Sequence, residues 1–176
     1  MQLGMVGLGR MGLNMLARLV EHGHAVVGFD PDGAARQRAV EVGGGAVESL
    51  PALVETLTPP RAIWVMVPAG EPTETVLFTL ADHLASGDAV VDGGNSYFRD
   101  TVVRAKRLAE RGIQLVDAGT SGGIWGRSQG YCLMVGGDPA VVRRLHPLFA
   151  ALAPEAGFLH VGPVGAGHFV KMVHNG

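Results

Sequence analysis

Short apolar runs alternate with longer amphipathic segments along most of the chain. The runs consist largely of valine, isoleucine, leucine and methionine at consecutive positions. Such runs are typical of strands that are buried on both faces of a parallel sheet. They are Gln2–Gly7, Ala25–Asp30, Ala62–Val67, Ala89–Asp92 and Gln114–Asp117. The pattern therefore predicts a buried, mostly parallel sheet.

The segments between these runs predict helices. They are Met11–His22, Gly33–Val42, Ser49–Leu57, Thr73–Leu84 and Phe98–Arg111. In the first, Leu13, Leu16 and Val20 recur at the spacing of one helical face. Asp32 and Ser49 are placed to cap the second and third. Because strand, helix and strand repeat, we predict an α/β fold with a doubly wound sheet and helices on both faces.

The rhythm changes after Asp117, where further strands are expected to extend the sheet on its C-terminal side. The predicted elements are a loop at 119–130, a strand at 131–137, a helix at Pro139–Leu152, a strand at 157–161 and a helix from Gly165 onward. No linker or low-complexity segment interrupts the chain. We expect one cofactor-binding domain, residues 1–176, that ends within its last helix.

Composition excludes several classes of protein. The 176 residues are 47% hydrophobic with a net charge of −2 and no basic run, so nothing favours nucleic acid or an anionic membrane surface. The N-terminal stretch lacks the basic flank and the cleavage site of a signal peptide. The single cysteine, Cys132, is predicted to be a small core residue, and its isolation favours a reducing cytoplasm. The seven scattered histidines predict no metal site.

Residues Gly7-Leu8-Gly9-Arg10-Met11-Gly12 match the pattern G-x-G-x-x-G between a strand and a helix. In this context Gly7 permits a tight turn, Gly9 lets a pyrophosphate approach the backbone, and Gly12 lets helix and strand pack closely. Asp30 ends the second strand, where a carboxylate accepts hydrogen bonds from a ribose diol and repels a 2′-phosphate. The sequence therefore predicts NAD rather than NADP, although Arg36 lies one helical turn beyond.

Three stretches at predicted strand ends extend this site, because ligands of open α/β sheets bind at the carboxyl ends of the strands. They are VPAG (67–70), DGGNS (92–96) and DAGTSGG (117–123). Each alone also fits an ordinary turn. The last contains G-x-S-x-G, but the glycines that follow argue against a hydrolase nucleophile elbow, which a helix should follow at once. A loop of donors that holds an anionic substrate is the better interpretation.

The last segment, GAGHFVKMVHNG, places His168, Lys171 and Asn175 on one helical face, with His174 beside them. A solvated polar face is the ordinary interpretation of such a stripe. Glycines at the helix start favour close packing against a cofactor or another backbone. A neutral lysine near a nicotinamide could remove the proton of a substrate hydroxyl.

In this order, the motifs GLGRMG, VPAG, DGGNS, GTSGG, YCLMVGG and GAGHFVKMVHNG closely resemble the 6-phosphogluconate dehydrogenase family over the whole chain. The resemblance implies a Rossmann-like cofactor domain with Lys171 as the general base. It further implies the following contacts. The cofactor would contact Gly7, Leu8, Gly9, Arg10, Met11, Gly12, Val67, Pro68, Ala69 and Asn95, to which the strand-end position adds Asp30. The substrate would contact Asn95, Ser121, Gly122, Gly123, His174 and Asn175.

The reaction implied by the resemblance is the NAD-dependent oxidative decarboxylation of 6-phosphogluconate to ribulose 5-phosphate. Asp30-Pro31-Asp32 replaces the Asn-Arg-Thr of NADP-dependent members, and Ile124 and Trp125 replace two glutamates. The family's acid would stand at position 178, and a helical second domain with the dimer interface is expected beyond. Without it, the turn at Lys171 is expected to be exposed and frayed, and the isolated chain inactive.

Two other functions also fit the sequence. One is a β-hydroxyacid dehydrogenase that acts on a small 3-hydroxy acid such as 3-hydroxyisobutyrate. The other is an NAD-binding module without enzymatic activity.

Overall fold

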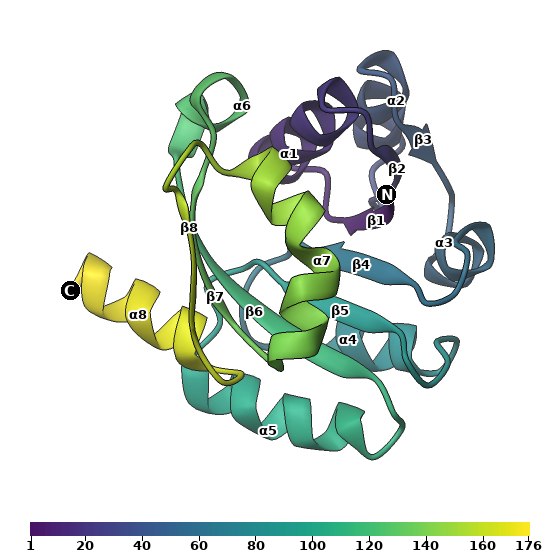
Figure 1. Ribbon diagram of the computed structural model, residues 1–176. Helices are drawn as coiled ribbons and strands as arrows, with labels where there is room; N and C mark the ends of the chain where they lie inside the picture. Colours follow the sequence, from purple (N-terminus) through teal and green to yellow (C-terminus); the bar gives the residue numbers. More distant parts are fainter.

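A single eight-stranded sheet forms the centre of the computed structural model, which describes residues 1–176 (Figure 1). The strands are β1 (Gln2–Val6), β2 (Ala25–Phe29), β3 (Gly45–Ala46), β4 (Ala62–Val65), β5 (Ala89–Asp92), β6 (Gln114–Ser121), β7 (Cys132–Gly136) and β8 (Phe158–Gly162). Their order is β3-β2-β1-β4-β5-β6-β7-β8. Strands β1 to β6 are parallel, β7 is antiparallel to β6, and β8 is parallel to β7. The predicted doubly wound sheet with extra strands at its C-terminal side is confirmed.

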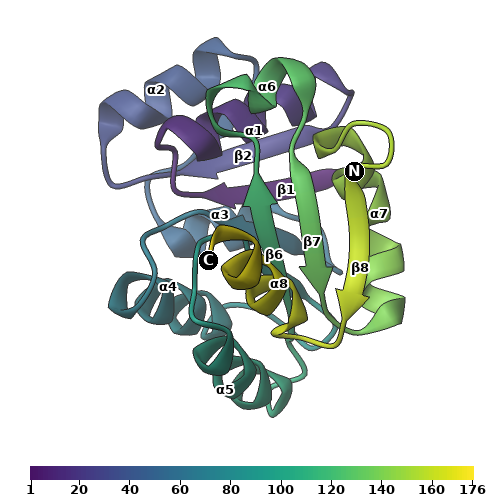
Figure 2. The ribbon, with the colours of Figure 1, turned by 90° about the vertical axis from the view of Figure 1, so that its left-hand side faces the viewer.

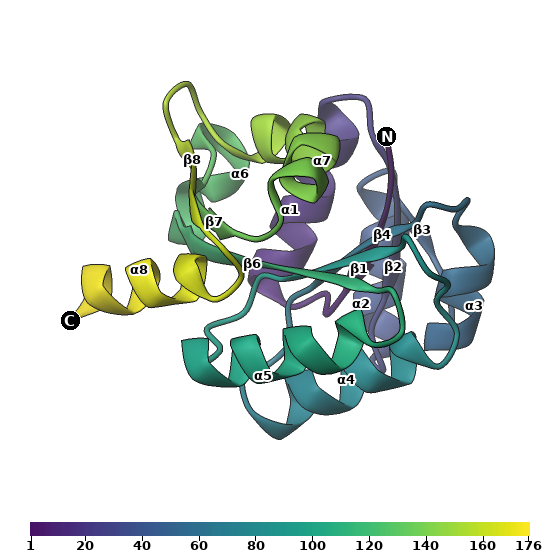
Figure 3. The same cartoon turned by 60° about the horizontal axis from the view of Figure 1, so that its bottom comes forward.

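Helices cover both faces of the sheet (Figure 3). They are α1 (Arg10–Glu21), α2 (Gly33–Glu41), α3 (Leu50–Thr56), α4 (Glu71–Ala81), α5 (Phe98–Ala109), α6 (Gly126–Gln129), α7 (Pro139–Leu152) and α8 (Ala166–Asn175). A 3-10 turn, η1 (Gly123–Trp125), precedes α6. Residues of α1, α2 and α7 join one hydrophobic core, and residues of α3, α4 and α5 join the other. None of the helices combines the length and the apolar character needed to cross a bilayer.

The alternation of side chains along β6 decides what its two faces carry. Val116 and Ala118 point into the core under α1 and α7, whereas Leu115 joins the core under α4 and α5. Asp117 and Gly119 therefore share the face of Leu115, and this is the face on which α8 lies. Figure 2 shows α8 in front of β6 and β7.

The capping residues predicted from the sequence mark the starts of α2 and α3. The Asp32 side chain accepts a hydrogen bond from Ala34 N at 3.0 Å, and Ser49 Oγ accepts one from Ala52 N at 3.1 Å. Both predicted caps are confirmed, because a short polar side chain before a helix satisfies a backbone N–H that has no partner within the helix.

The predicted loop at 119–130 is partly wrong. Strand β6 continues to Ser121 because residues Asp117–Ser121 pair with β7, and η1 and α6 follow it. The ring of Tyr131 lies beneath this turn: a Cβ on Gly126 would stand 2.0 Å from Tyr131 Cε1. The short strand β3 was not predicted either, since only two residues at a sheet edge form it.

Cys132 is exposed, so its assignment to the core is wrong. It opens β7 directly opposite Ser121. On that face α8 covers Met134 and Gly136 farther along the strand, but Cys132 lies beyond this cover. The apolar run alone could not reveal which of its residues the last helix would shield.

Candidate active site

The turn between β1 and α1 is shaped by glycines. Gly7 has a φ of +91°, and a Cβ at this position would stand 2.2 Å from Met66 O. Only glycine adopts this conformation in so narrow a space without strain. A Cβ on Gly12 would stand 1.9 Å from Gly7 O. The tight turn and the close approach of helix and strand, expected from the motif, are thus both present.

Gly9 differs from these two glycines because it faces open space. Its φ is −65°, and no atom lies within 4 Å of the position that a Cβ would take. Gly9 is also the residue before α1, whose first N–H groups have no partner within the helix. Arg10, exposed at the first helical position, adds a positive charge to this end. An anion can therefore approach the backbone here.

Asp30 is fixed beside this turn by two backbone groups. Its Oδ2 accepts a hydrogen bond from Leu8 N at 2.9 Å, and its Oδ1 accepts one from Asp32 N at 2.8 Å. Each carboxylate oxygen keeps a second lone pair for a ligand. Arg36 Nη1 donates to Asp30 O at 2.8 Å and to Pro31 O at 3.1 Å, so its guanidinium is held against the same strand end.

A cleft of about 680 Å³ lies at the carboxyl ends of β1, β2 and β4, and a smaller space of about 210 Å³ adjoins it. Met66, Val67 and Pro68 line both. Of the predicted cofactor residues, the larger cleft is lined by Gly7, Gly9, Asp30, Val67 and Pro68, and the smaller space by Met11, Val67, Pro68, Ala69 and Asn95. Leu8, Arg10 and Gly12 line neither; the Leu8 side chain is in the core. The strand-end stretches therefore meet at one edge of the sheet.

Helix α8 brings Lys171 directly onto β6. A Cβ added to Gly119 would stand 2.6 Å from Lys171 Cβ and 2.8 Å from Gly167 O. Ser121, two residues along β6, shares the face of Gly119. The structure thus places Lys171 and Ser121 on the same face of the sheet.

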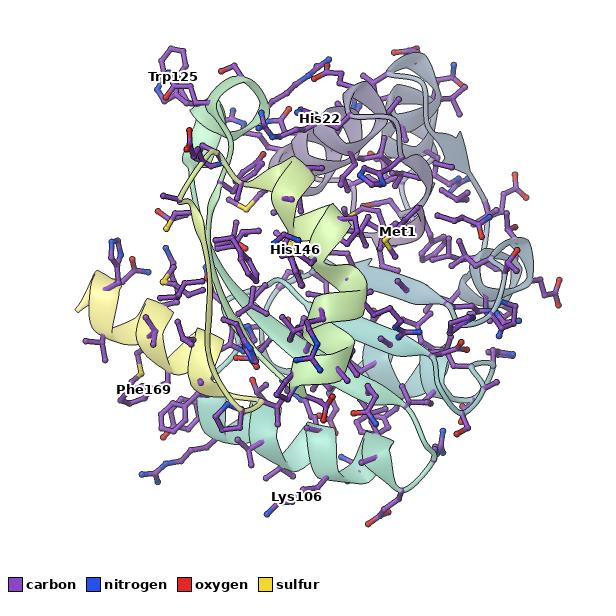
Figure 4. All side chains as sticks on the ribbon, viewed as in Figure 1. Met1, His22, Lys106, Trp125, His146 and Phe169 are labelled. Carbon is purple, nitrogen blue, oxygen red and sulfur yellow. The ribbon has the colours of Figure 1, made fainter.

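The remaining predicted substrate residues are not enclosed. Gly122 and Gly123 lead from β6 into η1, and His174 and Asn175 are exposed at the end of α8. Residues 172–176 are exposed, as predicted, but Lys171 is half-buried, and the helix continues through Asn175 instead of fraying. Phe169, labelled in Figure 4, is partly exposed and packs edge to face against Phe98 of α5, with ring centroids 5.2 Å apart.

His168 does not belong to a solvated stripe, as the ordinary interpretation of this helix would have it. Only 2% of His168 is exposed. Its Nε2 lies 3.1 Å from Asp92 O, and its Nδ1 lies 2.8 Å from Thr101 Oγ1. The backbone carbonyl can only accept, so Nε2 carries a proton and donates it. His168 therefore links α8 to β5 and α5.

Asp117, which was not predicted as an individual functional residue, closes the start of α8. Its Oδ1 accepts from Gly165 N at 2.7 Å, and its Oδ2 accepts from His168 N at 2.8 Å. The signal for it in the sequence was a charged residue at the end of a buried apolar run. Burial raises the pKa of Asp117, while the adjacent His168 and the two N–H donors oppose this rise.

Ile124 and Trp125 extend outward from η1. Trp125 points away from the body of the molecule in Figure 4, and 62% of it is exposed. The loop behind it is anchored, because the buried Arg18 donates from Nη1 to Arg127 O at 2.9 Å. The loop thus presents an aromatic surface near Ser121 in place of carboxylates.

The strand order, the glycine turn and the cleft at the strand ends define a dinucleotide-binding domain of the Rossmann type. The profile described as "NAD binding domain of 6-phosphogluconate dehydrogenase" matches residues 2–162. The chain therefore belongs to the family of 6-phosphogluconate dehydrogenase NAD-binding domains.

Related proteins match essentially the whole length of this chain. The NAD(+)-dependent, decarboxylating 6-phosphogluconate dehydrogenase of Haloferax volcanii is 44% identical and is matched over 100% of this chain and 58% of its own length. The NADP(+)-dependent enzyme of Bacillus subtilis is 35% identical, over 99% of this chain and 39% of its own length. Among solved structures, 3-hydroxyisobutyrate dehydrogenase of Mycobacterium tuberculosis has a TM-score of 0.90 and 30% identity, over 99% of this chain and 58% of that one. The chain thus spans well under two thirds of these proteins.

The raised pKa of Asp117 predicts a dependence of stability on pH. A carboxyl group whose pKa is raised by folding binds its proton more tightly in the folded state. Its contribution to stability is full below the ordinary pKa of about 3.9 and is lost as the pH rises through the raised value. The Asp117→Asn variant lacks this titration. We expect the free energy of unfolding of the wild type, minus that of the variant, to increase between about pH 7 and about pH 5.

Urea denaturation of both proteins at the two pH values measures this difference. Titrating groups that do not contact Asp117 are common to the two proteins and cancel, and a proton taken up by His168 beside the carboxylate would change the difference in the same direction. A difference that stays constant or shrinks on acidification would contradict the raised pKa.

Proposed function

We propose that this chain is the cofactor-binding half of an NAD-dependent enzyme that converts 6-phospho-D-gluconate to D-ribulose 5-phosphate. The observation that carries the proposal is the seating of Lys171 on Gly119 of β6, in the same sheet whose strands β1, β2 and β4 hold the cleft of Gly9 and Asp30 at their carboxyl ends. A helical second half would complete the substrate site and join two subunits. The whole enzyme would work in the cytoplasm on this phosphorylated sugar acid.

The residues of the cleft fit a dinucleotide. The open side of Gly9 and the start of α1 would hold the pyrophosphate, and Arg10 would add its charge. Asp30 would accept hydrogen bonds from the adenosine ribose. The nicotinamide end would lie toward Met11, Ala69 and Asn95, which line the smaller space. NAD, when bound, accepts the hydride that leaves C3 of the substrate.

Lys171 would supply the proton chemistry. As a neutral amine it would take the proton of the C3 hydroxyl while the hydride leaves C3. The resulting ammonium would polarise the new carbonyl, so that the β-keto acid loses CO2 and leaves an enediol. Protonation of the enediol gives ribulose 5-phosphate. Ser121, Gly122, Gly123, Asn95, His174 and Asn175 would orient the sugar acid.

Asp30 favours NAD over NADP in this proposal. Its carboxylate, held by Leu8 N and Asp32 N, cannot turn away from a 2′-phosphate. Arg36 is engaged by two backbone carbonyls and would have to leave them to bind that phosphate. The relative from Haloferax volcanii, named as NAD(+)-dependent, supports the same choice.

A dehydrogenase for a small 3-hydroxy acid is the second candidate. The observation that favours it is the exposed pair Ile124 and Trp125, where an apolar surface replaces the expected carboxylates. The likeness to 3-hydroxyisobutyrate dehydrogenase of Mycobacterium tuberculosis points the same way. A substrate panel separates the two candidates: turnover of 3-hydroxyisobutyrate without turnover of 6-phosphogluconate would replace the first proposal by the second.

Substitutions of Gly9 and Gly7 should affect different properties, the first cofactor binding and the second stability. Gly9→Ala meets open space and a permitted φ, so stability should change by less than about 0.5 kcal/mol. The added methyl group would occupy the pyrophosphate cradle and weaken NAD binding at least about tenfold. Gly7→Ala should instead destabilise the fold by at least about 2 kcal/mol through strain. Calorimetric titration and urea denaturation measure both; unchanged NAD affinity in Gly9→Ala would place the cofactor elsewhere.

Asp30→Ala should narrow the preference between the two cofactors. The variant loses the acceptor for the ribose diol and the repulsion of a 2′-phosphate, so NAD affinity falls while NADP affinity holds or rises. Asp32→Ala is the matched control: it removes a neighbouring exposed carboxylate that lies outside the cleft. Dissociation constants for both cofactors provide the measurement. Tighter binding of NADP than of NAD by the wild type would refute the preference.

Lys171→Ala should slow turnover strongly without affecting cofactor binding. In the full-length protein we expect kcat for 6-phosphogluconate to fall by about 10²- to 10⁴-fold, the range for loss of a general base. The control is Lys106→Ala, which removes the chain's only other lysine, an exposed residue of α5 (Figure 4). Activity retained in Lys171→Ala, with ribulose 5-phosphate still formed, would exclude Lys171 as the base.

A further inference from the structure

We propose that Asp117, His168 and Thr101 are positioning residues that fix helix α8, and with it the amine of Lys171, over the carboxyl edge of the sheet. The role of Lys171 in this inference rests on the proposed function. None of the three side chains needs to touch cofactor or substrate. Together they connect the helix to β5, β6 and α5, the elements that carry the rest of the site.

Asp117 determines where α8 begins. Its two oxygens bind Gly165 N and His168 N, at 2.7 and 2.8 Å, so the carboxylate takes two of the N–H groups that the start of a helix leaves without partners. Gly165 is in the left-handed region with a φ of +95°, where the chain turns into the helix. The carboxylate thus fixes both the turn and the first helical residues to one point of β6.

His168 fixes the rotation of the same helix. Its ring donates from Nε2 to Asp92 O on β5 and lies with Nδ1 against Thr101 Oγ1 on α5. The Nδ1 of His168 and the hydroxyl of Thr101 are 2.8 Å apart and share a hydrogen bond. The side chains of Asp117, His168 and Thr101 are almost completely buried. Asp117 holds the backbone at the start of the helix, and the ring of His168 holds its first turn. Together these contacts oppose translation of the helix along its axis and rotation about it.

The apolar contacts of this helix include an edge-to-face pair between Phe169 and Phe98 of α5, whose ring centroids are 5.2 Å apart. Gly167 and His168 are its only buried residues, whereas Phe169, Met172 and Val173 are exposed. Gly167 lies against the backbone, since a Cβ there would stand 2.4 Å from Met134 O. No large apolar side chain of α8 is fully buried, so we assign the position of the helix mainly to the polar anchor and to the backbone contact at Gly167. Lys171 is one turn beyond His168 and takes its place from the anchor.

The experiment compares Asp117→Asn with Asp88→Asn in the full-length protein. Asp88 is an equally buried aspartate that also accepts from two backbone N–H groups, Arg61 N and Ala85 N, and it pairs with Arg61. It precedes β5, at the opposite edge of the sheet. Its loss should lower stability without touching α8.

For Asp117→Asn we expect kcat to fall about 10- to 100-fold, the effect of a misplaced catalytic group, with the KM for NAD within about twofold of the wild type. Hydrogen exchange of the amides in 166–175 should accelerate at least about tenfold. Thr101→Val should show the same changes to a smaller extent, and Thr101→Ser, which keeps the hydroxyl, should restore wild-type values. Asp88→Asn should keep wild-type kcat and wild-type exchange in α8.

Two results would overturn the inference: a folded Asp117→Asn protein with unchanged exchange in α8, or equal losses of kcat in Asp117→Asn and Asp88→Asn. If the wild type turns over neither 6-phosphogluconate nor a small 3-hydroxy acid, the proposed function fails. The exchange of α8 still decides whether the anchor fixes the helix.

Discussion

The site depends on direct contact between the backbone of α8 and the sheet beneath it. No side chain separates Gly167 from the carbonyl of Met134, and none separates Gly119 of β6 from the backbone and Cβ of α8. Side chains normally hold helix and sheet apart, so this contact places Lys171 much closer to the strands than ordinary packing allows. A methyl group on either glycine would lift the helix and move the amine with it.

The same kind of contact recurs at the other candidate ligand site. Gly12 of α1 lies against Gly7 O, just as Gly167 lies against Met134 O. In both places a helix starts where its backbone touches a strand or the turn that follows it. Both contacts fix a helix at the sheet relative to neighbouring strand ends, α1 with the cradle at Gly9 on one face and α8 with the stem of Lys171 on the other. These close contacts join backbone atoms, so they fix the positions of the helices and bury little apolar side chain.

Features set by neighbouring residues in the sequence could be predicted, and features set by distant partners could not. The glycine turn, the caps at Asp32 and Ser49, and the parallel strands follow from local pattern. The extension of β6 to Ser121 depends on pairing with β7, which the pattern of β6 does not contain. The burial of His168 depends on Asp92 and Thr101, more than 60 residues away. For the same reason the sequence could locate Lys171 on a helix but not the anchor that holds it.

Three aspartates at the carboxyl edge of the sheet each accept two hydrogen bonds from nearby donors, with different consequences. Asp30 binds Leu8 N and Asp32 N, Asp92 binds Gly94 N and Ser96 Oγ, and Asp117 binds Gly165 N and His168 N. Each carboxylate thereby orders the segment that follows or faces its strand. Of the three, only Asp30 lines the cleft, so only its remaining lone pairs are accessible to a ligand. Asp92 and Asp117 are fully buried, and a buried carboxylate costs stability that an apolar side chain would not. Their presence is best explained by the loop and the helix that they hold in place.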